Sequence, residues 1–180
     1  MRQFTQGFYG YAVALFVCLL AVGLFLLITP QSRTEHIPRV DFTIDTANAA
    51  RLAPYEVEVP SQVPTGWTST SSRVTQDKSI LTWRLGFATG QKMHAMLAQS
   101  NEAPTAGFAS RLANTATVTG TQQIAGNTWE QRFREDKNQR SLVRILPDHT
   151  IIITGSADWP ELTTLATTLT PAPKPSTPSS

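Results

Sequence analysis

Histidine, serine and carboxylate side chains are the residues of this sequence that could do acid–base or metal chemistry. The three histidines, His36, His94 and His149, have no second His, Cys or carboxylate at metal-ligand spacing. The segment Gly-Ser-Ala-Asp at 155–158 lacks the Gly-x-Ser-x-Gly pattern of a nucleophile turn, and its polar residues fit the approach to a helix N-terminus. We therefore predict no catalytic residues, no metal and no cofactor. Carboxylates that pair only in the folded chain stay an open alternative.

Basic side chains gather on one predicted hairpin and form a candidate site for an anionic partner. The residues are Arg132, Arg134, Lys137, Arg140 and Arg144. A solvated sheet face would explain the same cluster without any partner. The alternative is electrostatic attraction of a lipid head group, a wall polymer or a protein.

Three of the four tryptophans form a second candidate site, an aromatic platform for a sugar or an apolar ligand. They are Trp67, Trp83 and Trp129. Each lies at the edge of a predicted strand beside apolar residues, so packing in the core is the competing interpretation.

Charge and cysteine content limit the classes of partner. All thirteen acidic residues and fourteen of the fifteen basic residues follow residue 30, so that part of the chain has a formal charge of only +1. A nucleic-acid-binding protein would normally carry a concentrated basic face, and we predict no nucleic-acid partner. The single cysteine, Cys18, lies inside an apolar run and cannot form a disulfide within the rest of the chain.

An uncharged apolar run near the N-terminus predicts a membrane anchor. Residues 11–28 read YAVALFVCLLAVGLFLLI, and Phe8 and Tyr9 before them fit the membrane interface. With these two aromatic residues the run reaches about twenty residues, the length needed to cross a bilayer. We therefore predict a transmembrane helix at 11–29. A cleaved signal peptide is the alternative, but the sequence Leu-Ile-Thr-Pro-Gln at the end of the run is a poor cleavage site.

The predicted topology is a single pass through the plasma membrane. Arg2 lies before the run, and Arg33 and Arg39 follow it, so the charge bias is close to a tie. The short N-terminal tail favours a cytoplasmic segment at 1–10 and a soluble domain outside the cell.

One domain follows the predicted anchor. Pro38, Pro54 and mixed polarity indicate a stalk at 30–54, with Asp45 as the N-cap of a short helix ending near Leu52. Residues 55–170 alternate strands, a helix, strands and a second helix. This order predicts an α+β fold in which helices pack on an antiparallel sheet. The Pro/Ser-rich tail at 171–180 is expected to be disordered.

Local patterns place the elements of this domain. Residues 80–88 alternate between apolar and polar, as in a half-buried strand. Residues 92–99 fit both a strand and a helix, and the preceding Gly-containing turn favours the strand. A helix is expected at about 104–113. Asp158 and Glu161 predict a second helix that begins with a capping box.

A hairpin with a five-residue loop at 135–139 is predicted to carry the basic cluster. This register places Arg134 opposite Arg140, and Glu130 opposite Arg144. The two arginines at the hairpin end would repel one another unless they splay apart or bind an anion.

Short motifs in a fixed order resemble a known family. They are Val40-Asp41, Val59-Pro60, Pro64-x-Gly66-Trp67, Thr82-Trp83-x-x-Gly86, Gln99-Ser100, Gly126-x-x-Trp129 and Thr154-Gly155. With the apolar run before them, they are similar to the actinobacterial domain-of-unknown-function family 4245. The resemblance implies a membrane-anchored envelope protein without an established activity, so it supplies no catalytic residues. The strand–helix order is also similar to the photosystem extrinsic protein and its lipoprotein relatives, at the level of fold alone.

The sequence leaves three functions open, and an enzyme is the less favoured class. The first is a tethered, extracytoplasmic module that binds an envelope polymer, a lipid or a membrane-protein partner. The alternative is an envelope-acting hydrolase or transferase whose site assembles only in the fold. The third is a structural subunit of a membrane complex.

Overall fold

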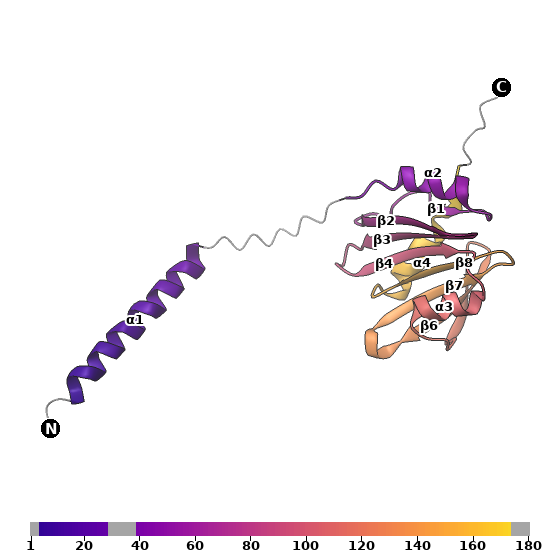
Figure 1. Ribbon diagram of the computed structural model, residues 1–180. Coiled ribbons are helices and arrows are strands. Elements are labelled where there is room, and N and C mark those ends of the chain that lie inside the picture. Colours follow the sequence, from indigo (N-terminus) through magenta and orange to yellow (C-terminus); the bar gives the residue numbers. More distant parts are fainter. Residues whose placement is uncertain (1–3, 29–38, 174–180) are drawn as a thin grey trace. The chain divides into compact units, whose positions relative to one another are not determined.

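The chain divides into two units, the first at residues 1–36 and the second at residues 37–180. The first unit contains an uncharged helix. The computed structural model describes residues 4–28 and 39–173, with the side chains of residues 10–24 and 39–173 (Figure 1). Helix α1 (Phe4–Ile28) contains no acidic or basic residue. Among the residues described, no helix combines the length and apolar character that a membrane crossing requires. The helix predicted at 11–29 is present up to residue 28. That this helix crosses a bilayer stays a prediction.

The second unit contains one seven-stranded sheet in which every neighbouring pair is antiparallel, as predicted. Two meanders build it, and they meet where β4 pairs with β8 in the middle of the sheet (Figure 1). From edge to edge the strands are β2 (Thr68–Asp77), β3 (Ile80–Ala88), β4 (His94–Ser100), β8 (Thr150–Gly155), β7 (Gln139–Ile145), β6 (Asn127–Arg134) and β5 (Gly120–Ile124). The segment 92–99, which the sequence left between strand and helix, thus contributes a central strand.

Helices pack on both faces of this sheet. Because successive side chains of a strand point to opposite faces, β4 and β8 present apolar residues to both sides. Leu97 and Ile153 pack with Leu162 of α4 (Trp159–Thr167), whereas Ala98 and Ile152 pack with Phe108 of α3 (Thr105–Ala113). We call these the α4 face and the α3 face.

The predicted capping box of α4 is present. Asp158 accepts from the backbone N–H of Glu161 at 2.9 Å, and the Glu161 side chain accepts from the Asp158 backbone N–H at 3.4 Å. This reciprocal pair satisfies two of the N–H groups that a helix start leaves free, so the short α4 begins at a defined residue.

The folded domain is longer than the predicted range 55–170. Helix α2 (Thr43–Leu52), inside the predicted stalk, packs on the α4-face core through the fully buried Ala49. Its first turn is bonded by Asp41, which accepts from the Thr43 N–H at 2.9 Å. Asp45 is therefore not the N-cap, because the helix begins two residues before it.

At the C-terminus a short strand extends the domain past residue 170. Strand β9 (Leu169–Pro171) pairs with β1 (Glu58–Pro60) in a separate two-stranded sheet. Residue 172 continues this contact, since the Ala172 N–H donates to the Val57 carbonyl at 2.8 Å. The rest of the tail predicted to be disordered, residues 174–180, lies outside the described residues.

The register predicted for the β6–β7 hairpin is wrong by one residue. A 3-10 turn at Glu135–Lys137 and Asn138 in the left-handed region (φ 45°) close the loop in four residues rather than five. Arg134 therefore lies opposite Gln139, and Arg140 lies opposite Phe133. Because side chains alternate along a strand, this shift separates arginines that the prediction placed on one face.

Gly155 is the residue that allows β8 to run close to β4. A Cβ at this position would overlap the carbonyl oxygen of His94. We expect Gly155→Ala to lower the free energy of unfolding by about 1–3 kcal/mol, the usual cost of overpacking. Urea unfolding of the full-length protein, followed by tryptophan fluorescence, measures this loss.

Gly107→Ala in α3 is the matched control. A Cβ there meets only the Pro104 side chain, at 3.4 Å, and alanine favours a helix over glycine by up to about 1 kcal/mol. Equal unfolding midpoints for Gly155→Ala and the wild type would contradict the packing described for β4 and β8.

Candidate functional site

The basic cluster does not form one surface, because it divides between the two faces of the sheet. On the α3 face, Arg132 is only 4% exposed and binds the Glu130 carboxylate at 2.7 Å. Arg134 on the same face forms a bidentate pair with Asp136 at 2.6 and 2.9 Å and donates to the Asn114 carbonyl at 2.6 Å. Both guanidinium groups are therefore bound by other parts of the domain.

The arginines on the α4 face are also bound within the domain. Arg144 is buried, forms an ion pair with Glu58 and lies over the Trp129 ring, with Cζ 5.1 Å from the centroid. Arg140 lies over the Phe133 ring, also at 5.1 Å. Lys137 is the one member of the cluster without an ion pair or side-chain hydrogen bond among the described residues.

The three candidate tryptophans do not form a common platform either. Trp83 and Trp129 are each 1% exposed and belong to the core of the α4 face. Trp67 is half-buried and packs at an interplanar angle of 59° on Phe87. It borders a cavity of about 420 Å³ together with Pro64 and Pro160. An aromatic contact with a ligand is thus available at Trp67 alone.

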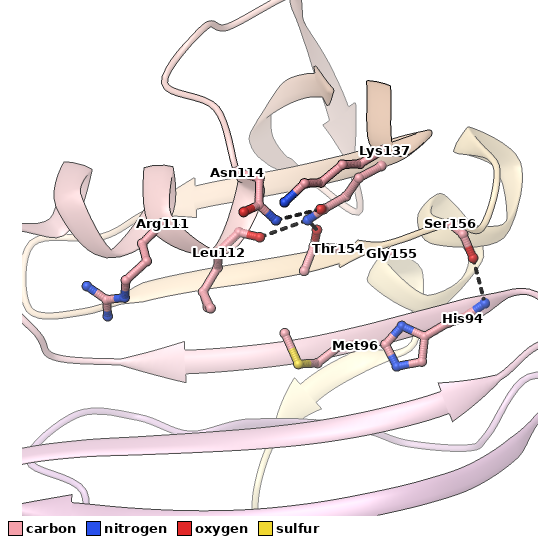
Figure 2. Close-up of a pocket in the computed structure, with 10 residues that line it drawn as sticks. His94, Met96, Arg111, Leu112, Asn114, Lys137, Thr154, Gly155 and Ser156 are labelled. Atoms are coloured by element: carbon pink, nitrogen blue, oxygen red, sulfur yellow. Dashed lines mark hydrogen bonds between the residues drawn. The ribbon is translucent and has the colours of Figure 1, made fainter. Parts of the chain in front are cut away.

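A cavity of about 410 Å³, lined by polar and basic residues together with Met96 and Leu112, opens on the α3 face and is the strongest candidate site (Figure 2). It lies where the end of α3, the β6–β7 loop and the ends of β4 and β8 meet. Figure 2 shows Lys137 and Asn114 on one side of it, with His94 and Met96 on the other. The lining residues are His94, Met96, Arg111, Leu112, Asn114, Lys137, Gln139, Thr154, Gly155 and Ser156.

A hydrogen-bond network holds the wall formed by α3 against the sheet. Asn114 caps α3 in the left-handed conformation, with φ 54°, and its side-chain amide donates to Gln139 at 2.7 Å. Gln139 in turn donates to the Leu112 carbonyl at 2.8 Å and to the Thr154 hydroxyl at 2.6 Å. These bonds make the wall rigid, because each amide of the network already has fixed partners.

The electrostatic character of the cavity is positive. None of the described residues that line it is acidic, and two of them are cations. Arg111 is paired in a bidentate manner with Glu102, at 2.7 Å for both bonds. This pairing compensates the charge of Arg111, so Lys137 is the lining cation that forms no ion pair among the described residues.

His94 and Ser156 lie side by side but do not form a nucleophile–base pair. The Ser156 hydroxyl accepts from the backbone N–H of His94 at 3.0 Å, whereas the imidazole ring points away from it (Figure 2). Burial lowers the pKa of His94, so the ring is neutral at neutral pH although part of it stays accessible. The pair therefore offers hydrogen bonds to a ligand rather than an activated nucleophile.

A carboxylate–histidine pair elsewhere in the domain combines a buried histidine, His149, with an exposed carboxylate, Asp148. The His149 ring binds Asp148 at 2.8 Å and is stacked on Tyr55, with 4.5 Å between ring centroids. Its Nε2 is buried without a partner among the described residues, and His149 lines none of the cavities described above. Across the described parts of the chain, no group of three His, Cys, Asp or Glu residues is placed to hold a metal ion.

The family model for "Protein of unknown function (DUF4245)" matches residues 3–169. The chain belongs to this family. The match confirms the resemblance drawn from the short motifs, and it contains every residue that lines the α3-face cavity. A search of curated proteins found none that matches the chain.

The sequence anticipated only part of the site in this DUF4245 member. It selected Lys137 as one of five basic residues, and it treated His94 and Ser156 as structural. Asn114 and Gln139 carried no signal, because neither belongs to a motif of chemical interest. The Thr154-Gly155 motif of the DUF4245 resemblance does point to the cavity, since both residues line it.

Replacement of the buried Arg144 should destabilise the domain more than replacement of Arg140. In Arg144→Ala the Glu58 carboxylate, which is mostly buried, loses its counter-ion, and we expect a loss of about 3 kcal/mol in the free energy of unfolding. Arg140→Ala removes a partly exposed cation–π contact and an exposed hydrogen bond to Asn138, and it should cost less than about 1 kcal/mol. Urea unfolding of both variants measures the difference. Equal losses would show that Arg144 does not stabilise the core in this way.

Proposed function

We propose that this protein is a membrane-tethered, extracytoplasmic binding module of the cell envelope, with the α3-face cavity as its ligand site. The observation that carries the proposal is the lining of this cavity. It combines a lysine that forms no ion pair with any residue the structure describes, amides held by a rigid network, and hydroxyl groups. Its histidine and serine are not arranged for nucleophilic attack. Its volume lies within the range of small-molecule sites.

Support for the tether comes from the sequence of the first unit. The run 11–28 is uncharged and apolar on all sides, the pattern of a helix surrounded by lipid. A helix satisfies its own backbone hydrogen bonds, which lipid requires. The proposal extends to a cytoplasmic N-terminus and a domain on the outer side of the plasma membrane, which the proteolysis experiment below tests.

The basic hairpin and Trp67 are secondary parts of the proposal. Of the five basic residues, Lys137 lines the cavity, and Arg140 is only partly exposed on the opposite face. Trp67 borders its own cavity on another side of the domain. These side chains would contact a partner that covers more of the domain than the cavity alone. Such a partner could be an envelope polymer, a lipid or a membrane protein.

Proteolysis of wall-stripped cells that express the protein with a C-terminal tag tests the topology. We expect protease outside the cell to remove the tag and to shorten the protein to a fragment retained in the membrane, because the domain is proposed to lie outside. A cytoplasmic protein of the same cells must stay intact as the control. Full protection of the tag would reverse the orientation, and release of the intact protein from washed membranes would contradict the tether.

A variant that fills the cavity tests the binding function. Met96→Trp adds an aromatic ring at the cavity floor, whereas Met93→Trp makes the same change at an exposed position outside it. After incubation with an extract of envelope material, native mass spectrometry should detect a bound molecule on the wild type and on Met93→Trp, and none on Met96→Trp. Circular dichroism checks that all three proteins are folded.

Two outcomes of this experiment would contradict the proposal. A bound molecule on all three proteins would place the ligand outside the cavity. The absence of any bound molecule on the wild type would contradict the binding function itself.

A further inference from the structure

We propose that the α3-face cavity binds the phosphoryl group of a phosphate ester, with Lys137 as the counter-ion and with Ser156 and His94 as hydrogen-bond donors. This inference rests on the proposed function of the cavity and names the chemical class of its ligand.

The first step is the unpaired charge of Lys137. Its nearest neighbour in sequence, Asp136, is bound on both carboxylate oxygens by Arg134, at 2.6 and 2.9 Å. That bidentate pair occupies a carboxylate that would otherwise compete for the lysine. Lys137 itself forms no ion pair among the described residues, and its side chain lies at the cavity wall (Figure 2). The site therefore has a cation that forms no ion pair among the described residues, although its charge acts on the neighbouring Asp136 carboxylate.

The second step is the row of polar side chains across three neighbouring strands. Gly155 of β8 lies opposite Ala95 of β4 and opposite Arg140 of β7. Ser156 follows Gly155, His94 precedes Ala95, and Gln139 precedes Arg140. These three residues therefore lie next to one another at the same end of the three strands. Since neighbouring strands are about 4.8 Å apart, the Ser156 and His94 side chains on adjacent strands can reach oxygens of one tetrahedral anion. The Gln139 amide is already bound within the network described above.

The third step is the direction of the Ser156 hydroxyl. Its oxygen already accepts the backbone N–H of His94 at 3.0 Å, so its own proton is free to be donated into the cavity. The neutral His94 ring can donate through one nitrogen. Because the pKa of His94 is lowered by burial, the positive charge of the site comes from Lys137 and not from the imidazole.

The fourth step favours phosphate over carboxylate. A carboxylate is best matched by the planar fork of an arginine, and the fork of Arg111 is already occupied by Glu102 through two bonds of 2.7 Å. The remaining cation is a lysine, a point charge that suits a phosphate with several equivalent oxygens.

The size of the cavity indicates that the phosphate is part of a larger molecule. Its volume of about 410 Å³ leaves room beyond a single anion, and Met96 and Leu112 supply apolar surface beside the polar groups. A phosphate ester with a carbon chain fits this combination. A soluble ester and a phospholipid head group share this chemistry, and the experiment must separate the two sources.

The test measures binding to the full-length protein in detergent micelles by isothermal titration calorimetry. The probes are sodium phosphate, glycerol 3-phosphate and dihexanoyl phosphatidylglycerol, with sodium acetate as the carboxylate comparison. We expect the phosphate esters to bind more tightly than acetate, and we expect added salt to weaken that binding. Tighter binding of the lipid than of glycerol 3-phosphate assigns the source to a membrane lipid, and the reverse assigns it to a soluble ester.

Three variants locate the site. Lys137→Gln should weaken ester binding by about tenfold to a hundredfold, the effect of one charged hydrogen bond. Ser156→Ala should weaken it by about threefold to tenfold, as for a neutral hydrogen bond. Lys78→Gln makes the same charge change in the β2–β3 turn, outside the cavity, and should bind as the wild type does.

The outcomes that overturn this inference differ from those that overturn the proposed function. Unchanged ester binding in Lys137→Gln, equal losses in Lys137→Gln and Lys78→Gln, or acetate binding as tight as that of the esters would each contradict a phosphoryl site at Lys137. If no phosphate probe binds while Met96→Trp still abolishes capture of an envelope molecule, only the phosphate assignment fails. If neither kind of binding occurs, both proposals fail.

Discussion

The pairing of β4 with β8 is the interaction on which the rest of the domain depends. The two strands are about sixty residues apart in sequence, yet together they join the meander β2–β3–β4 to the meander β5–β6–β7–β8. Both are buried on both faces, with Leu97 and Ile153 against α4, and Ala98 and Ile152 against α3. Both helices pack mainly on the second meander, α3 on β6, β7 and β8, and α4 on β5, β7 and β8. Leu97 and Ala98 of β4 extend the two cores beyond the junction.

The same pairing creates the cavity. Gly155 lets the backbones approach, and the next residues of the strands, His94 and Ser156, come together where α3 no longer covers the sheet. The amide network of Asn114 and Gln139 fixes the end of α3 to the first residue of β7. The hollow is therefore bordered by rigid elements on both sides, which is the arrangement that a preorganised binding site requires.

The β6–β7 hairpin decides how the basic residues are used. Its four-residue loop sets a register in which Arg132 and Arg134 face α3, while Arg140 and Arg144 face the α4 side. Arg144 then stabilises the core through Glu58 and Trp129, and Arg134 binds Asp136 beside Lys137. Basic residues that look alike in sequence thus have different roles, since each depends on the face and the neighbours that the register provides.

Much of the domain could be predicted from the sequence because its signals are local. The alternation at 80–88, the capping box of Asp158 and Glu161, and the helix at 105–113 depend on residues within one or two turns or along one strand. The hairpin register was wrong because the 3-10 turn and the left-handed Asn138 shorten the loop by one residue, and the sequence does not show this clearly. The place of α2 in the domain was missed because Ala49 is buried by strands that come later in the chain.

The sequence by itself determined the α+β class, the antiparallel strands and the uncharged N-terminal helix, because periodicity and capping act over short distances. Only the tertiary structure decided where the two meanders join, which tryptophans are buried and which residues of the basic cluster form ion pairs. These features depend on contacts between residues far apart in the chain, such as His94 with Ser156 and Glu58 with Arg144. No local pattern encodes such pairs, because their distance is set by the packing of the whole sheet.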